Sequence, residues 1–181
     1  LASLVGSEMC IRDSFSTVGI FRIAKRLVEP INYAITILNP YVQNQLSRED
    51  KDINFKDLIK NFLIPLIFVL TISYLSFGKN FIEFLSGKEF IEAYYPMLIL
   101  LIGYCTYLAT FWIRQLLLFN DLLQHHVVSK VISTVSFLVF SYFFVNQYGA
   151  SGLAIALSIS MILQKVYEFY IFNKFTKQTN K

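Results

Sequence analysis

The chain has 181 residues, of which 55% are hydrophobic and 15% are charged, whereas an ordinary soluble domain carries roughly 25% Asp, Glu, Lys and Arg. This composition argues against a soluble globular protein, because the apolar residues exceed what one small core can shield from water. It also excludes a disordered chain, and the presence of only two cysteines excludes a disulfide-stapled secreted domain. The net charge of +4 is small, and basic residues beside apolar runs favour membrane flanks over a nucleic-acid interface.

The opening stretch is expected to lie outside the native fold. It begins with Leu1 rather than Met, and it lacks the basic region and apolar run of a signal peptide. Residues 1–14 are similar to a translated sequencing-adapter read-through, so we expect them to be a sequencing or assembly artefact. The native part is then 15–181, which we expect to be a portion of a longer protein.

Four windows free of charged residues dominate the remaining sequence, namely 30–47, 61–78, 93–113 and 131–164. A helix needs about 20 apolar residues to cross a bilayer, so the last window is too long for one span. The turn-forming cluster at 146–152 divides it into a helical hairpin. Membrane strands would need sustained alternation of polarity, which the sequence lacks. The prediction is an all-α, polytopic transmembrane bundle of about five spans at 17–46, 61–78, 94–119, 128–146 and 152–172.

The distribution of Lys and Arg predicts the orientation of these spans. Basic residues gather in the 47–60 loop and the C-terminal tail, whereas the 79–93 connection carries only Lys79 and Lys88. An excess of Lys and Arg marks the cytoplasmic side, so the C-terminus is expected in the cytoplasm. The 79–93 segment is then an amphipathic connector on the outer surface.

The first predicted helix carries polar residues along one face. Successive members are three or four residues apart and include Arg22, Arg26, Glu29, Asn32, Thr36, Asn39 and Gln43, with Lys25 beside them. A charge within a bilayer is costly, so this face predicts a hydrated cavity that binds ligand. Alternatively, the cations Arg22, Lys25 and Arg26 reach the lipid headgroups at an interface.

Arg114 lies inside an apolar segment, where Tyr104, Tyr107 and Phe111 are expected on the same helical face. A guanidinium in this setting stacks on aromatic rings or holds a carboxylate or phosphate with two hydrogen bonds. This pattern favours a substrate-binding role for Arg114. The alternative is a side chain that only extends to the cytoplasmic surface.

Lys165 and Glu168 are three residues apart in the last predicted span, so they are expected to pair on one face. The pair is either a neutralised structural contact or a switch coupled to the movement of an ion or proton.

Local motifs for enzymatic chemistry are absent. The sequence has no nucleotide-binding glycine loop, zinc-protease signature, nucleophile elbow or paired CxxC. His125 and His126 are adjacent, so on a helix they point to different faces, and we expect them in a cytoplasmic turn without a metal. The sequence therefore predicts a protein that is not an enzyme and that needs no cofactor.

Three phrases, in order along the chain, resemble the C-terminal part of bacterial polysaccharide flippases. They are Val18–Arg26 (VGIFRIAKR), Phe77–Tyr94 with its FGK and LSGKEF segments, and Tyr148–Ala156 (YGASGLAIA). The family belongs to the multidrug/oligosaccharidyl-lipid/polysaccharide exporter superfamily. The resemblance covers nearly all of 15–181, and its phrases are specific only in combination.

The resemblance implies the C-terminal half of an exporter with about 12 to 14 spans in two pseudo-symmetric halves around a cavity. Such proteins lie in the bacterial cytoplasmic (inner) membrane, where they flip polyprenyl-diphosphate-linked oligosaccharides such as O-antigen precursors by alternating access. The implied partners are the lipid bilayer, this substrate and the missing N-terminal half, with no nucleic acid. Arg22, Lys25, Arg26 and Arg114 match the cationic residues that meet the substrate. Alternatives are a cation-coupled multidrug exporter of the same superfamily and a membrane-embedded glycosyltransferase or ligase fragment.

Overall fold

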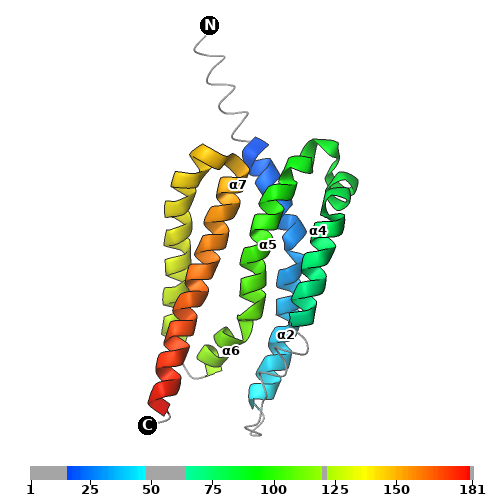
Figure 1. The fold of residues 1–181 in the computed structure, drawn as a ribbon. Coiled ribbons are helices and arrows are strands. Elements are labelled where there is room, and N and C mark those ends of the chain that lie inside the picture. Colours follow the sequence, from blue (N-terminus) through cyan, green and yellow to red (C-terminus); the bar gives the residue numbers. More distant parts are fainter. Residues whose placement is uncertain (1–15, 48–63, 120–121, 180–181) are drawn as a thin grey trace.

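A computed structural model describes residues 16–47, 64–119 and 122–179, and throughout these ranges the secondary structure is helical, without a strand. The predicted artefact at 1–14 and residues 48–60 of the basic loop lie outside the described residues. In chain order the elements are a helix over 16–28, α2 (Pro30–Ser47), α4 (Ile64–Ser86), the 3₁₀ helix η2 (Lys88–Ala93), α5 (Tyr94–Ala109), α6 (Phe111–Phe119) and α7 (Leu123–Thr179) (Figure 1).

Three helical segments of the described part are long and apolar enough to cross a membrane: Ile64–Ser86, Lys88–Ala109 and Gln124–Phe175. The exposed faces of these helices are apolar. Phe68 of α4 is 65% exposed and Leu138 of α7 is 61% exposed, together with many neighbouring apolar side chains. Exposed apolar faces of this extent suit a lipid environment, so this all-helical fold fits a multi-pass membrane protein.

The long helix α7 is a hairpin of two antiparallel arms, 123–148 and 150–179 (Figure 1). Gly149 joins the arms with a φ of 53° and a ψ of −125°, which are the angles of the first central residue of a type II′ turn. Hydrogen bonds between His126 and Glu168, far apart in sequence, confirm that the arms lie side by side. The turn predicted within 146–152 is therefore confirmed.

The first predicted helix, 17–46, is interrupted at Glu29. Residues 16–28 form one helix and α2 begins at Pro30. Because proline lacks an amide hydrogen and its ring crowds the preceding turn, it ends the first helix and begins the next. The prediction of one unbroken helix was wrong at this residue.

The second predicted helix, 61–78, runs further than expected. α4 continues through Lys79 to Ser86, so most of the predicted connector extends this helix. Gly87 ends it with a φ of 91°, which is the left-handed conformation that favours glycine at the end of a helix. η2 then leads directly into α5.

The third predicted helix, 94–119, is two helices. α5 ends at Ala109 and Thr110 has non-helical angles, with φ −116° and ψ 12°. The Thr110 hydroxyl donates to the carbonyl of Thr106 at 2.7 Å, a local bond that competes with the helical pattern and bends helices. Arg114 therefore lies on the short helix α6 and does not share a continuous helical face with Tyr104 and Tyr107.

α5 lies at the centre of the bundle and packs on α7, α4 and α2 (Figure 1). Gly103 brings α5 and the second arm of α7 close together, since a Cβ added there would lie 3.0 Å from the Ser158 backbone. The Ser158 hydroxyl donates to the carbonyl of Ile99 at 2.9 Å. Small residues thus allow close approach, and the core around them includes Met97, Leu100, Leu108 and Ala154.

Replacing Gly149 tests the turn of α7. We expect Gly149→Ala to lower the free energy of unfolding by about 1–2 kcal/mol, because an L-residue is strained at positive φ. Gly19→Ala is the matched control: Gly19 lies within the helix 16–28 and has open space around its Cβ position, so the change stabilises by roughly 0.5–1 kcal/mol. Thermal unfolding in detergent micelles measures both, and equal effects would contradict the proposed strain.

Candidate functional site

The Glu168 carboxylate is the centre of a buried ionic cluster between the two arms of α7. Its side chain has no exposed surface. Lys165 Nζ donates to Oε2 at 2.8 Å, which confirms the predicted pair. Oε1 accepts hydrogen bonds from the Ser129 hydroxyl at 2.9 Å and the Gln164 amide at 2.9 Å, and His126 Nδ1 lies 3.2 Å away. Four side chains thus surround one carboxylate.

Helical spacing on both arms builds this cluster. Residues three and four apart lie on one helix face, and the turn at Gly149 brings two such faces together. The first arm contributes His126, Ser129 and Lys130, and the second contributes Gln164, Lys165 and Glu168. Lys130 Nζ donates to Gln164 Oε1 at 3.4 Å, which adds a further contact between the arms.

The cluster holds more positive than negative charge. Lys165 and Lys130 both lie over the ring of Tyr107, with Nζ 4.2 Å and 5.8 Å from its centroid. The negative face of the ring stabilises these cations. The positive charges of Arg114 and Lys130 also oppose a positive charge on His126. Glu168 is the carboxylate of the cluster. The arrangement is suited to binding protons or anions rather than cations.

Arg114 has an unsatisfied polar atom. Its Nε is buried and has no hydrogen-bond partner among the described residues, although the side chain as a whole is half-buried. A buried donor without a partner costs about 1–3 kcal/mol. Arg114 lies beside the cluster. Its role as a substrate-binding residue stays a prediction.

The lower part of the predicted polar face, on α2, is engaged within the protein. Gln115 of α6 donates to Asn39 Oδ1 at 2.8 Å and accepts a bond from Gln43 Nε2 at 3.2 Å. Asn32 lies beside Tyr104 of α5. These amides therefore join α2 to its neighbours across the bundle.

The upper part of the polar face is different. Arg22, Lys25 and Arg26 are exposed, and Glu29 is half-buried at the break before α2. The opposite side of this helix is apolar and fully buried, as at Ala24 and Val28. The three predicted cations are thus held on the accessible side of a helix that is anchored by its apolar face.

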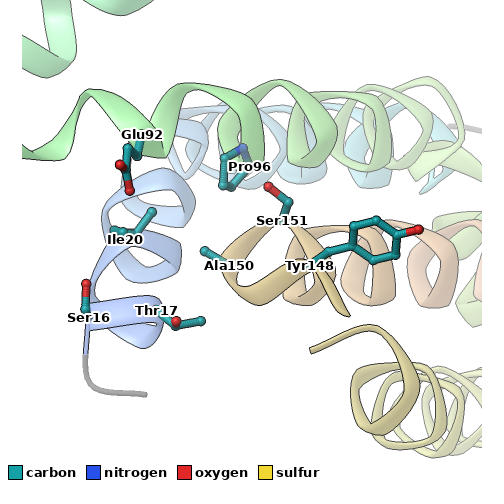
Figure 2. A pocket seen from close by; sticks show the side chains of 8 residues that line it. All are labelled: Ser16, Thr17, Ile20, Glu92, Pro96, Tyr148, Ala150 and Ser151. Carbon is teal, nitrogen blue, oxygen red and sulfur yellow. The ribbon is translucent and has the colours of Figure 1, made fainter. Parts of the chain in front are cut away.

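A hollow of about 340 Å³ lies at the end of the bundle where α7 turns. Figure 2 shows that it is lined from three elements: the start of the helix 16–28 with Thr17, the η2 to α5 region with Glu92 and Pro96, and the α7 turn with Tyr148 and Ser151. Its lining is polar, yet the predicted substrate cations are not among its lining residues.

The ionic cluster lies toward the other end, with α6 and the C-terminal part of α7 (Figure 1). At 1.5 Å per residue, Glu168 is roughly 28 Å along the helix from Gly149. This distance is close to the thickness of the hydrocarbon layer, about 30 Å. A bilayer that has the turn at one surface would therefore have the cluster near the other.

His126 is the principal residue that the sequence analysis missed. The expectation of a turn was wrong, because His126 lies on α7 and is 8% exposed. Ser129, Gln164 and Gln115 were also missed. The useful signal was the polar spacing of 126, 129 and 130, which matches that of 164, 165 and 168 once an antiparallel hairpin is assumed.

Comparison of the chain with protein-family models, with curated proteins and with solved structures gives no match.

Breaking the buried pair tests its contribution to stability. We expect Lys165→Met to lower the free energy of unfolding by about 3–5 kcal/mol, because it leaves the Glu168 charge buried without its cation. Lys88→Met is the matched control, since Lys88 pairs with Glu83 at 3.4 Å with an exposed fraction of 82%, and such surface pairs contribute about 0–1 kcal/mol.

The double variant Lys165→Met with Glu168→Gln separates charge from packing. Removing the carboxylate charge as well should recover part of the loss. Chemical unfolding in micelles provides the measurement. A double variant that is less stable than Lys165→Met would show that the uncompensated charge is not the cause.

Proposed function

We propose that the chain is part of a bacterial membrane exporter that flips lipid-linked oligosaccharides, without covalent chemistry of its own. The observation that carries the proposal is the contrast between two kinds of exposed surface. α4 and the first arm of α7 expose apolar side chains, whereas the helix 16–28 exposes three cations. A substrate with an apolar lipid tail and an anionic diphosphate head needs an apolar surface for the tail and a cationic surface for the head.

The order of helices supports five membrane crossings in this proposal. The segment 16–47, α4, η2 with α5, and the two arms of α7 would each cross once. α6 spans only Phe111–Phe119, about 13 Å of helix, and is too short to cross. Together with an N-terminal half, these five would form an exporter of about 12 to 14 spans in the cytoplasmic membrane, with the C-terminus in the cytoplasm.

Cationic side chains are the proposed contacts for the diphosphate. Arg22, Lys25 and Arg26 are accessible, and Arg114 has a buried donor that finds no partner within the described ranges. A guanidinium binds phosphate oxygens through two parallel hydrogen bonds, which gives both charge and geometric fit. Glu29, Asn32 and Asn39 continue the polar face and would meet the sugar hydroxyls when the cavity opens.

A cation-coupled multidrug exporter of the same superfamily is the second candidate. The buried cluster around Glu168 favours the form of this candidate in which the coupling cation is a proton, because ionisable groups inside a membrane often belong to proton pathways. The two candidates differ in phenotype. Cells without a flippase lose surface glycan, whereas cells without a drug exporter become sensitive to cationic dyes.

Neutralising the cations tests the proposed function. We expect the combined variant Arg22→Gln, Arg26→Gln and Arg114→Gln to reduce transport of lipid-linked oligosaccharide roughly tenfold or more, since each charged hydrogen bond contributes about 1.5–3 kcal/mol. Transport by the complete exporter in proteoliposomes gives the measurement. Lys88→Gln is the control, because Lys88 is exposed near Gly87 and belongs to a surface pair. Unchanged transport in the triple variant would remove these residues as substrate contacts.

Hydration of the polar face has its own test. Thr36 is exposed near the middle of the segment 16–47, and Val135 is exposed near the middle of the first arm of α7. We expect a membrane-impermeant maleimide to label Thr36→Cys in the bilayer and to leave Val135→Cys unlabelled. Protection of Thr36→Cys from both sides would contradict a hydrated passage along this helix.

A further inference from the structure

Both oxygens of the Glu168 carboxylate already accept hydrogen bonds. Oε1 accepts from Ser129 and Gln164, Oε2 accepts from Lys165, and His126 Nδ1 lies within hydrogen-bond distance of Oε1. A carboxylate held by so many donors is strongly stabilised in its charged form. The carboxylate is therefore the fixed part of the cluster, and any group that gains or loses a proton has to be found among its neighbours.

The contact with Glu168 also fixes the tautomer of His126. Nδ1 faces a negatively charged oxygen at 3.2 Å, so a lone pair on Nδ1 would be repelled and the hydrogen has to be on Nδ1. In the neutral ring the lone pair is then on Nε2. Nε2 is the basic atom of this cluster that has room for one more proton.

Accessibility differs across the cluster. The His126 side chain is 10% exposed, whereas Lys165 is 5% exposed and Glu168 is fully buried. The imidazole therefore connects the surface of the bundle with the buried ion pair. A proton that reaches the cluster adds to Nε2, while the hydrogen on Nδ1 stays bonded to the Glu168 carboxylate.

We propose that His126 is a proton-binding site whose occupation loosens the contact between the two arms of α7. The proton adds to the Nε2 lone pair, no other bond is broken, and the neutral hydrogen bond to Glu168 becomes an ion pair. Glu168 then faces two cations, His126 and Lys165. Because its negative charge is divided between them, it attracts Lys165 less strongly. That attraction acts within the second arm, so the arms are separated by the new charge itself: it is buried between them, and Lys165 of the second arm repels it.

Neighbouring charges increase this effect. Arg114 on α6, Lys130 on the same arm, and Lys165 on the second arm all face the cluster, and Tyr107 on α5 lies beneath both lysines. Glu168 is the acidic group in contact with His126. One added proton therefore raises an existing excess of positive charge, and separation of the arms relieves it. This inference holds for any transported substrate, so it goes beyond the proposed function.

The test measures the distance between the arms as a function of pH. Spin labels are placed on two exposed residues, Val131 of the first arm and Val166 of the second, in the full chain in lipid nanodiscs with both cysteines replaced by serine. Distances are recorded between about pH 8 and about pH 5, the range in which histidine changes charge. We expect the distribution to lengthen or broaden at low pH and to return at high pH.

Two variants test whether His126 causes the pH-dependent change in distance. His126→Gln keeps an amide donor for Glu168 but binds no proton, so the pH-dependent change in distance should be lost. His125→Gln is the matched control: His125 lies next in sequence and its Nδ1 is 3.4 Å from the Tyr167 hydroxyl, so the change should remain. Persistence of the change in His126→Gln would overturn the proposal.

A second measurement does not depend on how His126→Gln folds. The chain has two histidines, so ¹⁵N-histidine spectra of His125→Gln report on His126 alone. We expect Nδ1–H at high pH and protonation of Nε2 at low pH. A ring with hydrogen on Nε2 at high pH, a ring that stays neutral to about pH 5, or protonation without movement of the arms would each overturn the proposal.

Discussion

The central constraint on this fold is the Glu168 carboxylate, which has to be satisfied where water is excluded. A charge in a low-dielectric setting is tolerated only if it is paired and hydrogen-bonded. Donors from both arms of α7 meet this demand, and Lys165 supplies the opposite charge at 2.8 Å. Because a slip of one residue would separate these groups, the cluster specifies the register of the arms as well as neutralising the charge.

The two ends of α7 constrain the hairpin by different means. At one end, Gly149 adopts backbone angles that reverse the chain within a single residue. At the other end, the ionic cluster joins the arms through side chains. Between them, small residues of the second arm allow the close approach of α5, as the contact between Gly103 and Ser158 shows. The middle of the second arm is therefore held by its packing on α5, whereas the end that holds the cluster is joined by charged side chains.

The sequence predicted those features that depend on local pattern. Apolar windows indicated the long helices, the cluster at 146–152 indicated the turn, and the spacing of Lys165 and Glu168 indicated their pairing. Two helix boundaries were missed: the break at Thr110, where the hydroxyl bonds the carbonyl of Thr106, and the continuation of α4 past Lys79 to Ser86. The role of His126 required knowledge of the opposite arm, which only tertiary structure supplies.

The polar face of the first helix is divided between two uses. On α2, amides such as Asn39 are hydrogen-bonded to neighbouring helices, so they would have to exchange these bonds to meet a ligand. On the helix 16–28, the three cations are exposed, and the buried face that packs on the described part of the bundle is apolar. Charge that packing does not use is available to a ligand. The break at Glu29 separates the part of the polar face that is available to a ligand from the part that joins α2 to α5 and α6.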